Sequence, residues 1–284
     1  MWDNRDSLKA VVLIGLAVTT AMQAAARAEV APCNPSTVAY WRFDGDYTDS
    51  CGSIDGTPVG SASIATSNCA PLSGNSGCLV LTGSPSRVDL PAPFNPTHTG
   101  TLSAGTIEAW VYFEGTDQGD CCACIFDHGV AAISTDLQLE VRPHTGGGYD
   151  SQLDAANIAY PVFLLPGFTP NTWHHLAWTW DATTVTSYMD GVVVGTAAGP
   201  LSVSFTGNEA AIGSGNQELS YWVGRLDEIR LSNRVLAPCE FLAHLPTCPT
   251  LSEWGLIAMA ALMLLAGGVV IARRRAGQGI TSYE

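Results

Sequence analysis

Hydrophobic and polar residues alternate one by one along several short stretches of the chain. From Thr106 to Phe113 the odd-numbered positions are Ile, Ala, Val and Phe. Because successive side chains of a strand point to opposite faces, this pattern predicts a strand with one face in a core. Trp173–Trp180 behaves likewise, and we predict a last strand at Trp222–Leu231. No amphipathic helix of three turns separates these stretches, which indicates an all-β domain.

One turn is predicted in detail. Val185–Met189 and Val192–Thr196 flank the dipeptide Asp190-Gly191. These two residues tolerate the positive φ angles that a two-residue hairpin turn requires. The sequence therefore predicts a tight hairpin here.

The N-terminal segment has the features of a secretory signal. Charged residues within positions 1–9 are followed by the uncharged stretch Val11–Ala26 and the small-x-small sequence Ala26-Arg27-Ala28. This order predicts export and cleavage after residue 28. The alternative is a first transmembrane helix, but the stretch contains polar residues and is shorter than the roughly 20 strongly apolar residues of a span. We therefore predict a signal peptide over residues 1–28.

A second uncharged segment, Trp254–Ala272, lies near the C-terminus. As a helix of about 1.5 Å per residue it reaches roughly 28 Å, close to the hydrocarbon thickness of a bilayer. Arg273-Arg274-Arg275 follows, and clustered arginines beside a span stay in the cytoplasm. A buried core helix is the alternative, but the segment is apolar on every face. We predict a transmembrane helix at 254–272, with the preceding residues outside and 276–284 forming a cytoplasmic tail.

The same region resembles a known sorting tail. The sequence Pro249-Thr250-Leu251-Ser252-Glu253-Trp254-Gly255-Leu256, the apolar span and the arginines resemble the IPTL-CTERM domain of Gram-negative bacteria. One departure is that Cys248 stands where the name of the motif has Ile. The resemblance implies recognition by a membrane-embedded processing protease, so that the membrane anchor is temporary. We assign residues 248–275 to this tail.

The predicted exported region is strongly acidic. Between Glu29 and Glu253 it has six Arg, no Lys and 23 Asp plus Glu, a net charge of −17 with His neutral. Such a surface repels phosphate backbones, which excludes nucleic acid as a partner. Cations and neutral sugars remain open as ligands. The alternative is that the acidity only keeps an exported protein soluble.

All nine cysteines lie in the predicted exported region, where oxidising conditions preserve disulfides. The candidates for pairing are Cys33, Cys51, Cys69, Cys78, Cys121, Cys124, Cys239 and Cys248. Their odd total leaves at least one thiol unpaired in a monomer. The connectivity stays open, although Cys33 would meet Cys239 or Cys248 if the two termini adjoin. The sequence Cys121-Cys122-Ala123-Cys124 suggests a zinc knuckle, but no second ligand pair has metal spacing, so we favour a loop disulfide.

Many short strands without helices favour a two-sheet antiparallel sandwich, since each strand has to bury one face. Five sequences then carry a resemblance to a family: Val38–Asp44 with Asp49–Gly52, Gly105–Val111, Asn171–Ala177, Tyr188–Gly191 and Gly224–Arg234. In this order they resemble the laminin-G-like, concanavalin A-like jelly roll. The resemblance covers residues 38–240 and implies that the first and last strands are neighbours. We assign residues 29–247 to this domain.

The sequence lacks the motif with which jelly-roll glycosidases place their carboxylates on one strand, Glu-x-Asp-x-x-Glu. Asp227 and Glu228 are adjacent, so a regular strand would direct them to opposite faces. We interpret Glu228 as an ion-pair residue with Arg230 as its candidate partner. His174 and His175 lie within a strand and have no nucleophile elbow near them. We therefore expect no catalytic residue.

Three aspartates are candidate ligands for structural Ca²⁺, namely Asp44, Asp49 and Asp227. Hard cations bind clustered carboxylate oxygens, and jelly rolls of this class often hold one. Asp44 and Asp49 lie close together in one loop, and Asp227 lies on the last strand, beside the first strand. The alternative is a solvated acidic turn.

Four aromatic residues near predicted loops are candidates for stacking against a sugar: Tyr149, Tyr160, Tyr221 and Trp222. Core packing accounts better for Trp110, Trp178 and Trp180.

These features together predict an exported, membrane-tethered or sorted surface protein. Its non-catalytic laminin-G-like domain is expected to bind a glycan or an extracellular protein. The expected location is the inner membrane with the domain in the periplasm, or the cell surface after processing. Two alternatives remain: a glycan-cleaving enzyme that brings carboxylates together from distant strands, and a structural component of the envelope or matrix without a ligand.

Overall fold

The computed structural model describes residues 32–91, 101–115, 122–130, 134–155, 158–159, 162–199, 202–205, 209–215 and 220–243. All of them belong to one compact unit, Val30–Pro246. The predicted signal peptide and the predicted transmembrane helix at 254–272 lie outside the described residues. Within the described residues, no helix is long and apolar enough to cross a membrane.

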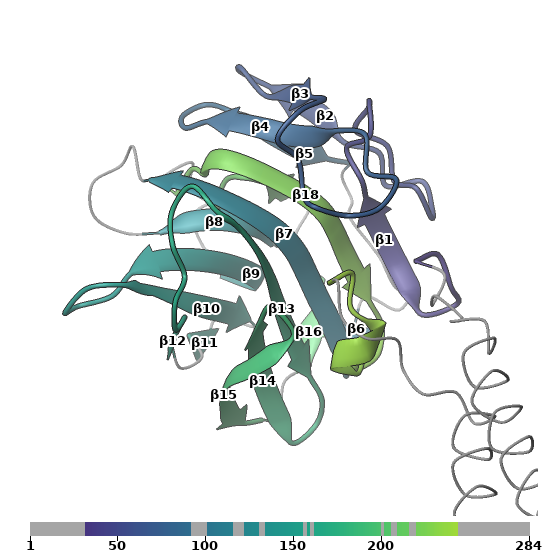
Figure 1. Ribbon diagram of the computed structural model, residues 1–284. Helices are drawn as coiled ribbons and strands as arrows, with labels where there is room; N and C mark the ends of the chain where they lie inside the picture. Colours follow the sequence, from purple (N-terminus) through teal and green to yellow (C-terminus); the bar gives the residue numbers. More distant parts are fainter. Residues whose placement is uncertain are drawn as a thin grey trace, which may run out of the picture. The chain divides into compact units, whose positions relative to one another are not determined.

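Two antiparallel sheets make up most of this unit (Figure 1). Sheet A contains, in spatial order, β15 (Val192–Ala198), β14 (Thr184–Met189), β13 (Trp173–Trp180), β7 (Gly105–Gly115), β18 (Val223–Ser232), β4 (Cys78–Thr82) and β3 (Ser63–Ala65), with β1 (Thr37–Trp41) also paired to β18. Sheet B contains β11 (Ile158–Ala159), β10 (Tyr149–Ala155), β9 (Ser134–Pro143), β8 (Ala123–Val130), β17 (Glu209–Ile212), β5 (Arg87–Leu90) and β2 (Thr57–Val59), with β12 (Phe163–Leu164) also paired to β10.

Two smaller elements complete the described structure. β16 (Val203–Ser204) pairs with β6 (Thr101–Leu102), and the 3-10 helix η1 (Pro238–Glu240) follows β18. The sequence prediction of an all-β, two-sheet antiparallel jelly-roll sandwich is confirmed by this arrangement.

The hydrophobic core draws side chains from both sheets. The apolar positions of the alternation in β7 all enter it, namely Ile107, Ala109, Val111 and Phe113. From β9 the core receives Leu137, Leu139 and Val141, which are likewise spaced two residues apart. The intervening residues of these strands therefore point away from the core.

The predicted hairpin is confirmed. β14 and β15 pair directly, and the two residues between them, Asp190 and Gly191, have φ angles of 48° and 75°. Positive φ at both positions is the conformation that the Asp-Gly sequence favours in a two-residue turn. The turn is also tied to β13, because the Asp190 carboxylate accepts a hydrogen bond from the backbone N–H of His175 at 2.8 Å.

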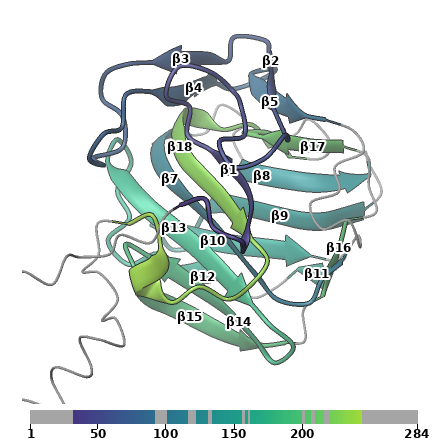
Figure 2. The same cartoon turned by 90° about the vertical axis from the view of Figure 1, so that its right-hand side faces the viewer.

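The first and last strands lie side by side, as expected. β1 pairs antiparallel with β18, with Trp41 opposite Ile229 (Figure 2). This neighbourhood does not lead to the suggested disulfide between the termini. Cys33 is bonded to Cys51 instead, so its predicted pairing with Cys239 or Cys248 was wrong.

A β-bulge interrupts the pairing of β18 with β7. The register shifts between Asp227 and Arg230, and Glu228 takes a φ of 51°. One extra residue in a strand removes the strict alternation of faces. Glu228 Oε1 consequently lies 3.5 Å from Arg42 Nε, while Arg230 pairs with Glu108, so the expected pairing of Glu228 with Arg230 was wrong.

The segment after β18 folds back over the outer face of sheet A. The Trp110 indole N–H donates to the Leu242 carbonyl at 2.6 Å, and the Leu242 N–H donates to Glu108 Oε2 at 2.8 Å. Arg230 Nη2 donates to the Glu240 carbonyl at 2.7 Å. The segment that these bonds hold in place covers the outer face of sheet A at β7 and β18.

Candidate functional site

The outward face of sheet B carries a group of polar side chains on three neighbouring strands. Since Leu137, Leu139 and Val141 of β9 enter the core, the residues between them point outward. The same reasoning applies to β10, where Leu153 enters the core. In β8 a register shift places both Ile125 and Phe126 in the core, so Cys124 and Asp127 are assigned to this face because they pair with Glu140 and Gln138. We call these outward residues the polar face: Cys124, Asp127, Asp136, Gln138, Glu140, Arg142, Asp150, Gln152 and Asp154.

Strand register places these residues in rows across the sheet. Gln138 of β9 lies opposite Asp127 of β8 on one side and opposite Asp154 of β10 on the other. In the next row, Glu140 lies between Cys124 and Gln152. Directly opposite residues have Cβ atoms about 4.5–5.5 Å apart, so adjacent rows form one continuous polar surface. Figure 2 shows β8, β9 and β10 as neighbouring bands.

Four of the five carboxyl groups on this face are buried, namely those of Asp127, Asp136, Glu140 and Asp150. Asp127 and Glu140 are each 3% exposed, whereas Asp154 is partly exposed. Burial, together with the nearby carboxylates of Glu140 and Asp136, raises the pKa of Asp127 to about 8. Burial and the carboxylate of Asp154 raise the pKa of Glu140 to about 7. Both groups therefore bind protons near neutral pH.

Amide and guanidinium groups connect the carboxylates. Gln152 Nε2 donates to Asp154 Oδ1 at 2.6 Å, and Arg142 donates to Gln152 Oε1. Arg142 also lies 3.9 Å from Glu140. Arg142 is half-buried, so the guanidinium borders the buried carboxylates while it remains in contact with solvent. The polar face thus combines hydrogen-bond acceptors, amide donors and one cation.

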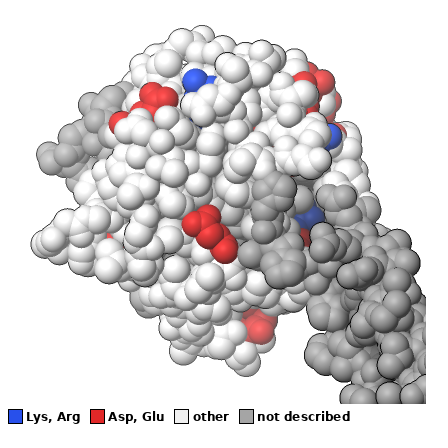
Figure 3. Space-filling view, in the orientation of Figure 1, with Lys and Arg blue, Asp and Glu red and all other residues white. Residues whose placement is uncertain are grey.

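The described surface has few cations elsewhere. In the view of Figure 3, Lys and Arg form small isolated spots, and Asp and Glu form separate patches. This distribution agrees with the excess of acidic residues in the sequence.

The aromatic residues predicted for sugar stacking do not form a platform. Trp222 is fully buried, and its ring packs 5.2 Å from Phe113 in the core, so this prediction was wrong. Tyr149 also packs against Phe113, and Tyr221 is 2% exposed. A ring whose faces contact the core cannot stack on a sugar. Tyr160 lies outside the described residues.

The three predicted calcium ligands are not assembled into one cage. The Asp49 carboxylate forms hydrogen bonds with nearby backbone groups. Oδ1 accepts hydrogen bonds from the backbone N–H groups of Tyr40 at 2.9 Å and Cys51 at 3.0 Å, and Oδ2 accepts one from that of Ile54 at 3.3 Å. With both oxygens bonded to the backbone, Asp49 has little capacity for a cation. The prediction of Asp49 as a ligand is therefore corrected.

Asp44 is similarly occupied. Its Oδ1 accepts the backbone N–H of Gly77 at 3.1 Å, and its Oδ2 forms an ion pair with Arg42 at 2.6 Å. Asp227 accepts hydrogen bonds from Ala70 and Asn75, which lie in the loop between β3 and β4 that also contains Gly77. The donor set that calcium prefers, several free oxygens directed to one point, does not fit these residues as they are arranged.

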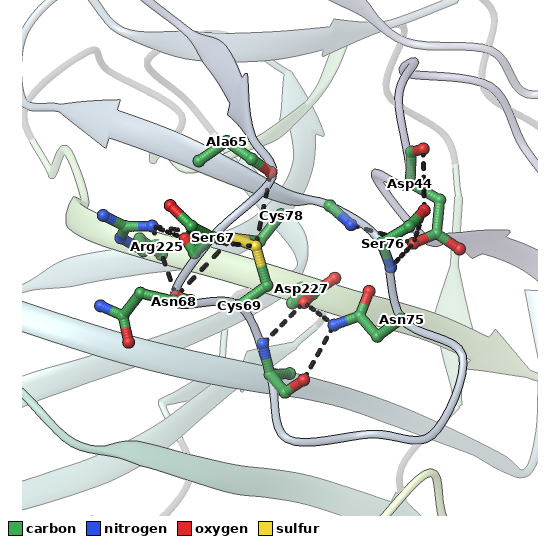
Figure 4. Close-up of a disulfide and its surroundings, with 12 residues drawn as sticks. Asp44, Ala65, Ser67, Asn68, Cys69, Asn75, Ser76, Cys78, Arg225 and Asp227 are labelled. Atoms are coloured by element: carbon green, nitrogen blue, oxygen red, sulfur yellow. Dashed lines mark hydrogen bonds between the residues drawn. A yellow bond between two sulfur atoms is a disulfide. The ribbon is translucent and has the colours of Figure 1, made fainter.

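One group with the spacing of a metal site does occur among the described residues. It consists of Cys69, Cys78 and Asp227, whose ligand atoms all lie within 4.8 Å of one another. The two sulfurs are joined in a disulfide, so neither is the free thiolate that binds a metal. Figure 4 shows this group, with Cys69 in the loop between β3 and β4, Cys78 at the start of β4 and Asp227 on β18.

The cysteines differ from the prediction at two further positions. Cys124 is a free, fully buried thiol, so its assignment to a disulfide was wrong. Cys122, which the prediction omitted, is disulfide-bonded, as is Cys239. Cys69 pairs with Cys78. Cys121 and Cys248 lie outside the described residues.

The sequence analysis did not predict the polar face, although the alternation of polar and apolar residues in two of its strands can be recognised. Asp136-x-Gln138-x-Glu140-x-Arg142 and Asp150-x-Gln152-x-Asp154 alternate polar with mostly apolar residues at a period of two. Such alternation marks one face of a strand. The motif Glu-x-Asp-x-x-Glu describes carboxylates on a single strand, whereas the carboxylates of the polar face are distributed over three strands.

Fold and sequence together define the class of the protein. Residues 83–240 match the family model described as the concanavalin A-like lectin/glucanases superfamily, and residues 249–275 match the IPTL-CTERM motif. Because the first match spans more than half of the chain, the chain belongs to the concanavalin A-like lectin/glucanases superfamily. The IPTL-CTERM motif is a C-terminal sorting signal of surface or extracellular proteins. The comparison with curated proteins found no match.

Solved structures share the fold. Domain 4 of AbnA, an extracellular arabinanase of family GH43 from Geobacillus stearothermophilus in complex with arabinotriose, is 20% identical with a TM-score of 0.56, over 72% of this chain and 96% of that chain. The binding domain of Paraclostridial Mosquitocidal Protein 1 is 14% identical with a TM-score of 0.52, over 72% of this chain and 50% of that chain. The receptor binding domain of botulinum neurotoxin C/D mosaic serotype is 9% identical, also with a TM-score of 0.52, over 72% and 49%. The chain thus spans about half the length of the two toxin chains, and identities this low establish the fold alone.

Proposed function

We propose that this protein is a surface protein that binds a glycan, without cleaving it, through the polar face of sheet B. The observation that carries the proposal is the arrangement of carboxylate, amide and guanidinium groups on the outward positions of β8, β9 and β10. A few polar groups placed close together can form hydrogen bonds with the hydroxyls of a sugar, and these bonds fix the orientation of the ligand.

The chemistry of the polar face suits hydroxyl groups. Carboxylates accept hydrogen bonds, glutamine amides both donate and accept, and Arg142 donates. Sugar hydroxyls also both donate and accept, so each side chain can find a complementary partner. No aromatic residue is present among the nine residues of the polar face, so the proposed recognition relies on hydrogen bonds rather than on ring stacking.

Structural relatives support a binding role. The domain of the arabinanase is described in complex with arabinotriose, and the two toxin domains are described as binding or receptor binding domains. The acidic composition is compatible with a neutral sugar and unfavourable for a polyanionic glycan, which would be repelled. We therefore place neutral oligosaccharides first as ligands, ahead of an extracellular protein.

The sorting tail supports a location outside the cytoplasm. We propose that the chain is exported by its N-terminal signal and held by the apolar segment at 254–272, with the domain on the outer side of the inner membrane. A membrane-embedded processing protease then removes the tail and releases the domain to the cell surface. Mass spectrometry of the mature protein tests this step, since a C-terminus at Glu284 would show that the anchor is kept.

A glycan array tests the proposed binding. The detergent-solubilised full chain is applied to neutral and acidic oligosaccharides, and each hit is incubated with the protein and assayed for new reducing ends. Binding without product supports the proposal. Absence of binding to every glycan would refute it and favour a protein ligand or a structural role.

A second candidate function, glycan cleavage, is favoured by one observation. Asp127 and Glu140 have pKa values raised to about 8 and about 7, so near neutral pH they can retain the proton that a general acid donates. Asp154 lies beside them as a further carboxylate. If the reducing-end assay gives product and Glu140→Gln abolishes it while binding persists, the protein is an enzyme and the non-catalytic proposal fails.

A further inference from the structure

The disulfide between Cys69 and Cys78 lies between two groups that can influence its chemistry (Figure 4). On one side, Arg225 Nη1 lies 3.9 Å from Cys78 Sγ. On the other, a carboxylate oxygen of Asp227 lies within 4.8 Å of both sulfurs. A guanidinium stabilises a thiolate, and a carboxyl group can supply a proton to it.

The two sulfurs differ in accessibility. The Cys69 residue is half-buried in the loop that joins β3 to β4, whereas Cys78, at the start of β4, is completely buried. An external thiolate can therefore reach the sulfur of Cys69 more readily than that of Cys78. Cys78 would be the leaving group, and it is the sulfur beside Arg225.

The Asp227 carboxyl has one oxygen bonded and one free. Its Oδ2 accepts hydrogen bonds from the Ala70 N–H at 3.1 Å and from Asn75 Nδ2 at 2.7 Å. Oδ1 is buried and has no hydrogen-bond partner among the described residues. Burial raises the pKa of this group to about 7, so a large fraction of the molecules carries a proton there at neutral pH.

The second disulfide provides a contrast within the same molecule. Cys33 is exposed and Cys51 is half-buried, so solvent reaches this bond more easily than Cys69–Cys78. Among the described residues, no carboxylate or imidazole lies within 4.8 Å of both of its sulfurs. Accessibility and chemical environment therefore predict opposite orders of reactivity for the two disulfides.

We propose that Cys69–Cys78 is a redox-active disulfide that exchanges with an external thiol, with Arg225 stabilising the leaving Cys78 thiolate and Asp227 protonating it. Its substrates are thiols, either small molecules or a protein dithiol in the compartment outside the cytoplasm. The proposal is independent of glycan binding, because the site lies on the outer face of sheet A.

The exchange balances as follows. The external thiolate attacks Cys69 Sγ, a new S–S bond forms, and the bond to Cys78 breaks with its electron pair on Cys78 Sγ. Asp227 gives its proton to this thiolate and is reprotonated by the proton that the external thiol released. A second thiol attacks the mixed disulfide and leaves Cys69 as a thiol. In total, two thiols are oxidised to one disulfide and the protein disulfide is reduced to two thiols.

Reduction would also release a loop. The disulfide closes the segment from residue 69 to residue 78, and this segment supplies both hydrogen bonds to Asp227, from Ala70 and Asn75. Once the bond is open, hydrogen bonds such as these and those of Ser76 and Gly77 to Asp44 hold the segment without a covalent link. The redox state of the thiol pool is thereby coupled to the order of this loop.

Reaction with glutathione tests the order of reactivity. The native full chain is incubated with reduced glutathione, quenched with an alkylating reagent at successive times, and analysed by peptide mass spectrometry. We expect a glutathione adduct on Cys69 and reduction of Cys69–Cys78 at least about tenfold faster than that of Cys33–Cys51, because leaving-group stabilisation speeds exchange. Equal rates, or faster reduction of the exposed Cys33–Cys51 bond, would overturn the proposal.

A pair of matched variants tests the role of Asp227. Asp227→Asn cannot donate the proton, whereas Glu228→Gln removes an adjacent buried carboxyl whose pKa is also raised to about 7. The charged groups around Asp227 are Asp44, which raises its pKa, the adjacent Glu228 with its partner Arg42, and Arg225 on the far side of the disulfide. With rates corrected for the thiolate fraction of glutathione, we expect the wild type and Glu228→Gln to slow as pH rises through about 7, and Asp227→Asn to be slow at every pH.

The same measurement reports on folding. In a variant that unfolds, both disulfides would be reduced rapidly and at similar rates. The order of the two reduction rates in the wild type would then test the proposal by itself. An Asp227→Asn protein that keeps the wild-type rate and pH profile would contradict the assigned proton donor.

Discussion

Arg230 of β18 donates a hydrogen bond from Nε to Oε1 of Glu108 on the neighbouring strand β7, at 2.7 Å, and both side chains are almost completely removed from solvent. His175 Nε2 lies 2.8 Å from the other oxygen of Glu108. Although burial alone would raise it, Arg230 and His175 hold the pKa of Glu108 below its ordinary value. The three residues join β7, β13 and β18 beneath the segment that follows β18.

Removal of one partner of this ion pair should strongly destabilise the fold. Arg230→Met leaves the Glu108 carboxylate buried without its cation, and breaking a buried pair in this way costs about 3–5 kcal/mol. Urea unfolding measures the loss. The matched control is Asp89→Asn, which removes the exposed partner of Arg87 and should cost no more than about 1 kcal/mol. Similar losses in the two variants would contradict the assignment of Glu108 and Arg230 as a structural centre.

The polar face should make stability depend on pH. Folding raises the pKa of Asp127 to about 8 and that of Glu140 to about 7, so the folded protein keeps protons that the unfolded chain loses above about pH 4. The stabilisation is present in acid and is lost as pH rises toward about 8, by up to about 1.4 kcal/mol per pH unit for each group.

The double variant Asp127→Asn, Glu140→Gln tests this dependence. The variant retains the shapes of both side chains but has neither titrating group. Its free energy of unfolding should therefore fall less steeply between pH 5 and pH 8, and should exceed that of the wild type most at pH 8. Urea unfolding at several pH values provides the comparison. A wild-type curve that is flat or rises over this range would show that the two carboxyls are not perturbed as described.

The free thiol of Cys124 should be unreactive in the folded protein. The side chain is fully buried, and burial with the nearby carboxylates of Asp127 and Glu140 raises its pKa well above the ordinary value. The reactive species is the thiolate, so iodoacetamide at pH 8 should leave Cys124 unmodified until urea is added. Peptide mass spectrometry with and without urea checks this. Rapid alkylation in native buffer would show that the polar face is open to solvent at this point.

Calcium should have little effect on the stability of this domain. Asp44 and Asp49 already accept hydrogen bonds or an ion pair at both oxygens, so a cation would have to displace them. A ligand that binds only the folded state raises the unfolding midpoint, and we expect the same midpoint with calcium and with a chelator. A rise with calcium would mean that the loops at Asp44 and Asp227 rearrange to form a site.

Local patterns in the sequence predicted the frame of the fold. The alternation in β7 identified the core face, and Asp190-Gly191 identified the hairpin, because each pattern has one dominant structural meaning. The pairing of Cys33 with Cys51 was out of reach, since cysteine spacing does not determine connectivity. The partner of Glu228 was missed because a bulge changes the face of one residue without a clear sequence signal.

The polar face illustrates the same limit. The alternations in β9 and β10 are legible, but the position of Asp127 opposite Gln138 depends on register shifts in the pairing of β8 with β9. Long-range register cannot be read from the pattern of one strand. The sequence pointed instead to aromatic residues, of which Tyr221 and Trp222 are buried in the fold.

The most direct test of the proposed function is the affinity of polar-face variants for the glycan that the array identifies. Gln138→Ala and Asp154→Asn alter partly exposed residues of the polar face, and Thr196→Ala alters an exposed residue of sheet A as the matched control. If the polar face is the binding site, titration calorimetry should show losses of about tenfold or more for the first two, equivalent to about 1.4 kcal/mol, and unchanged affinity for Thr196→Ala. Wild-type affinity in both polar-face variants would contradict the assignment of glycan binding to sheet B.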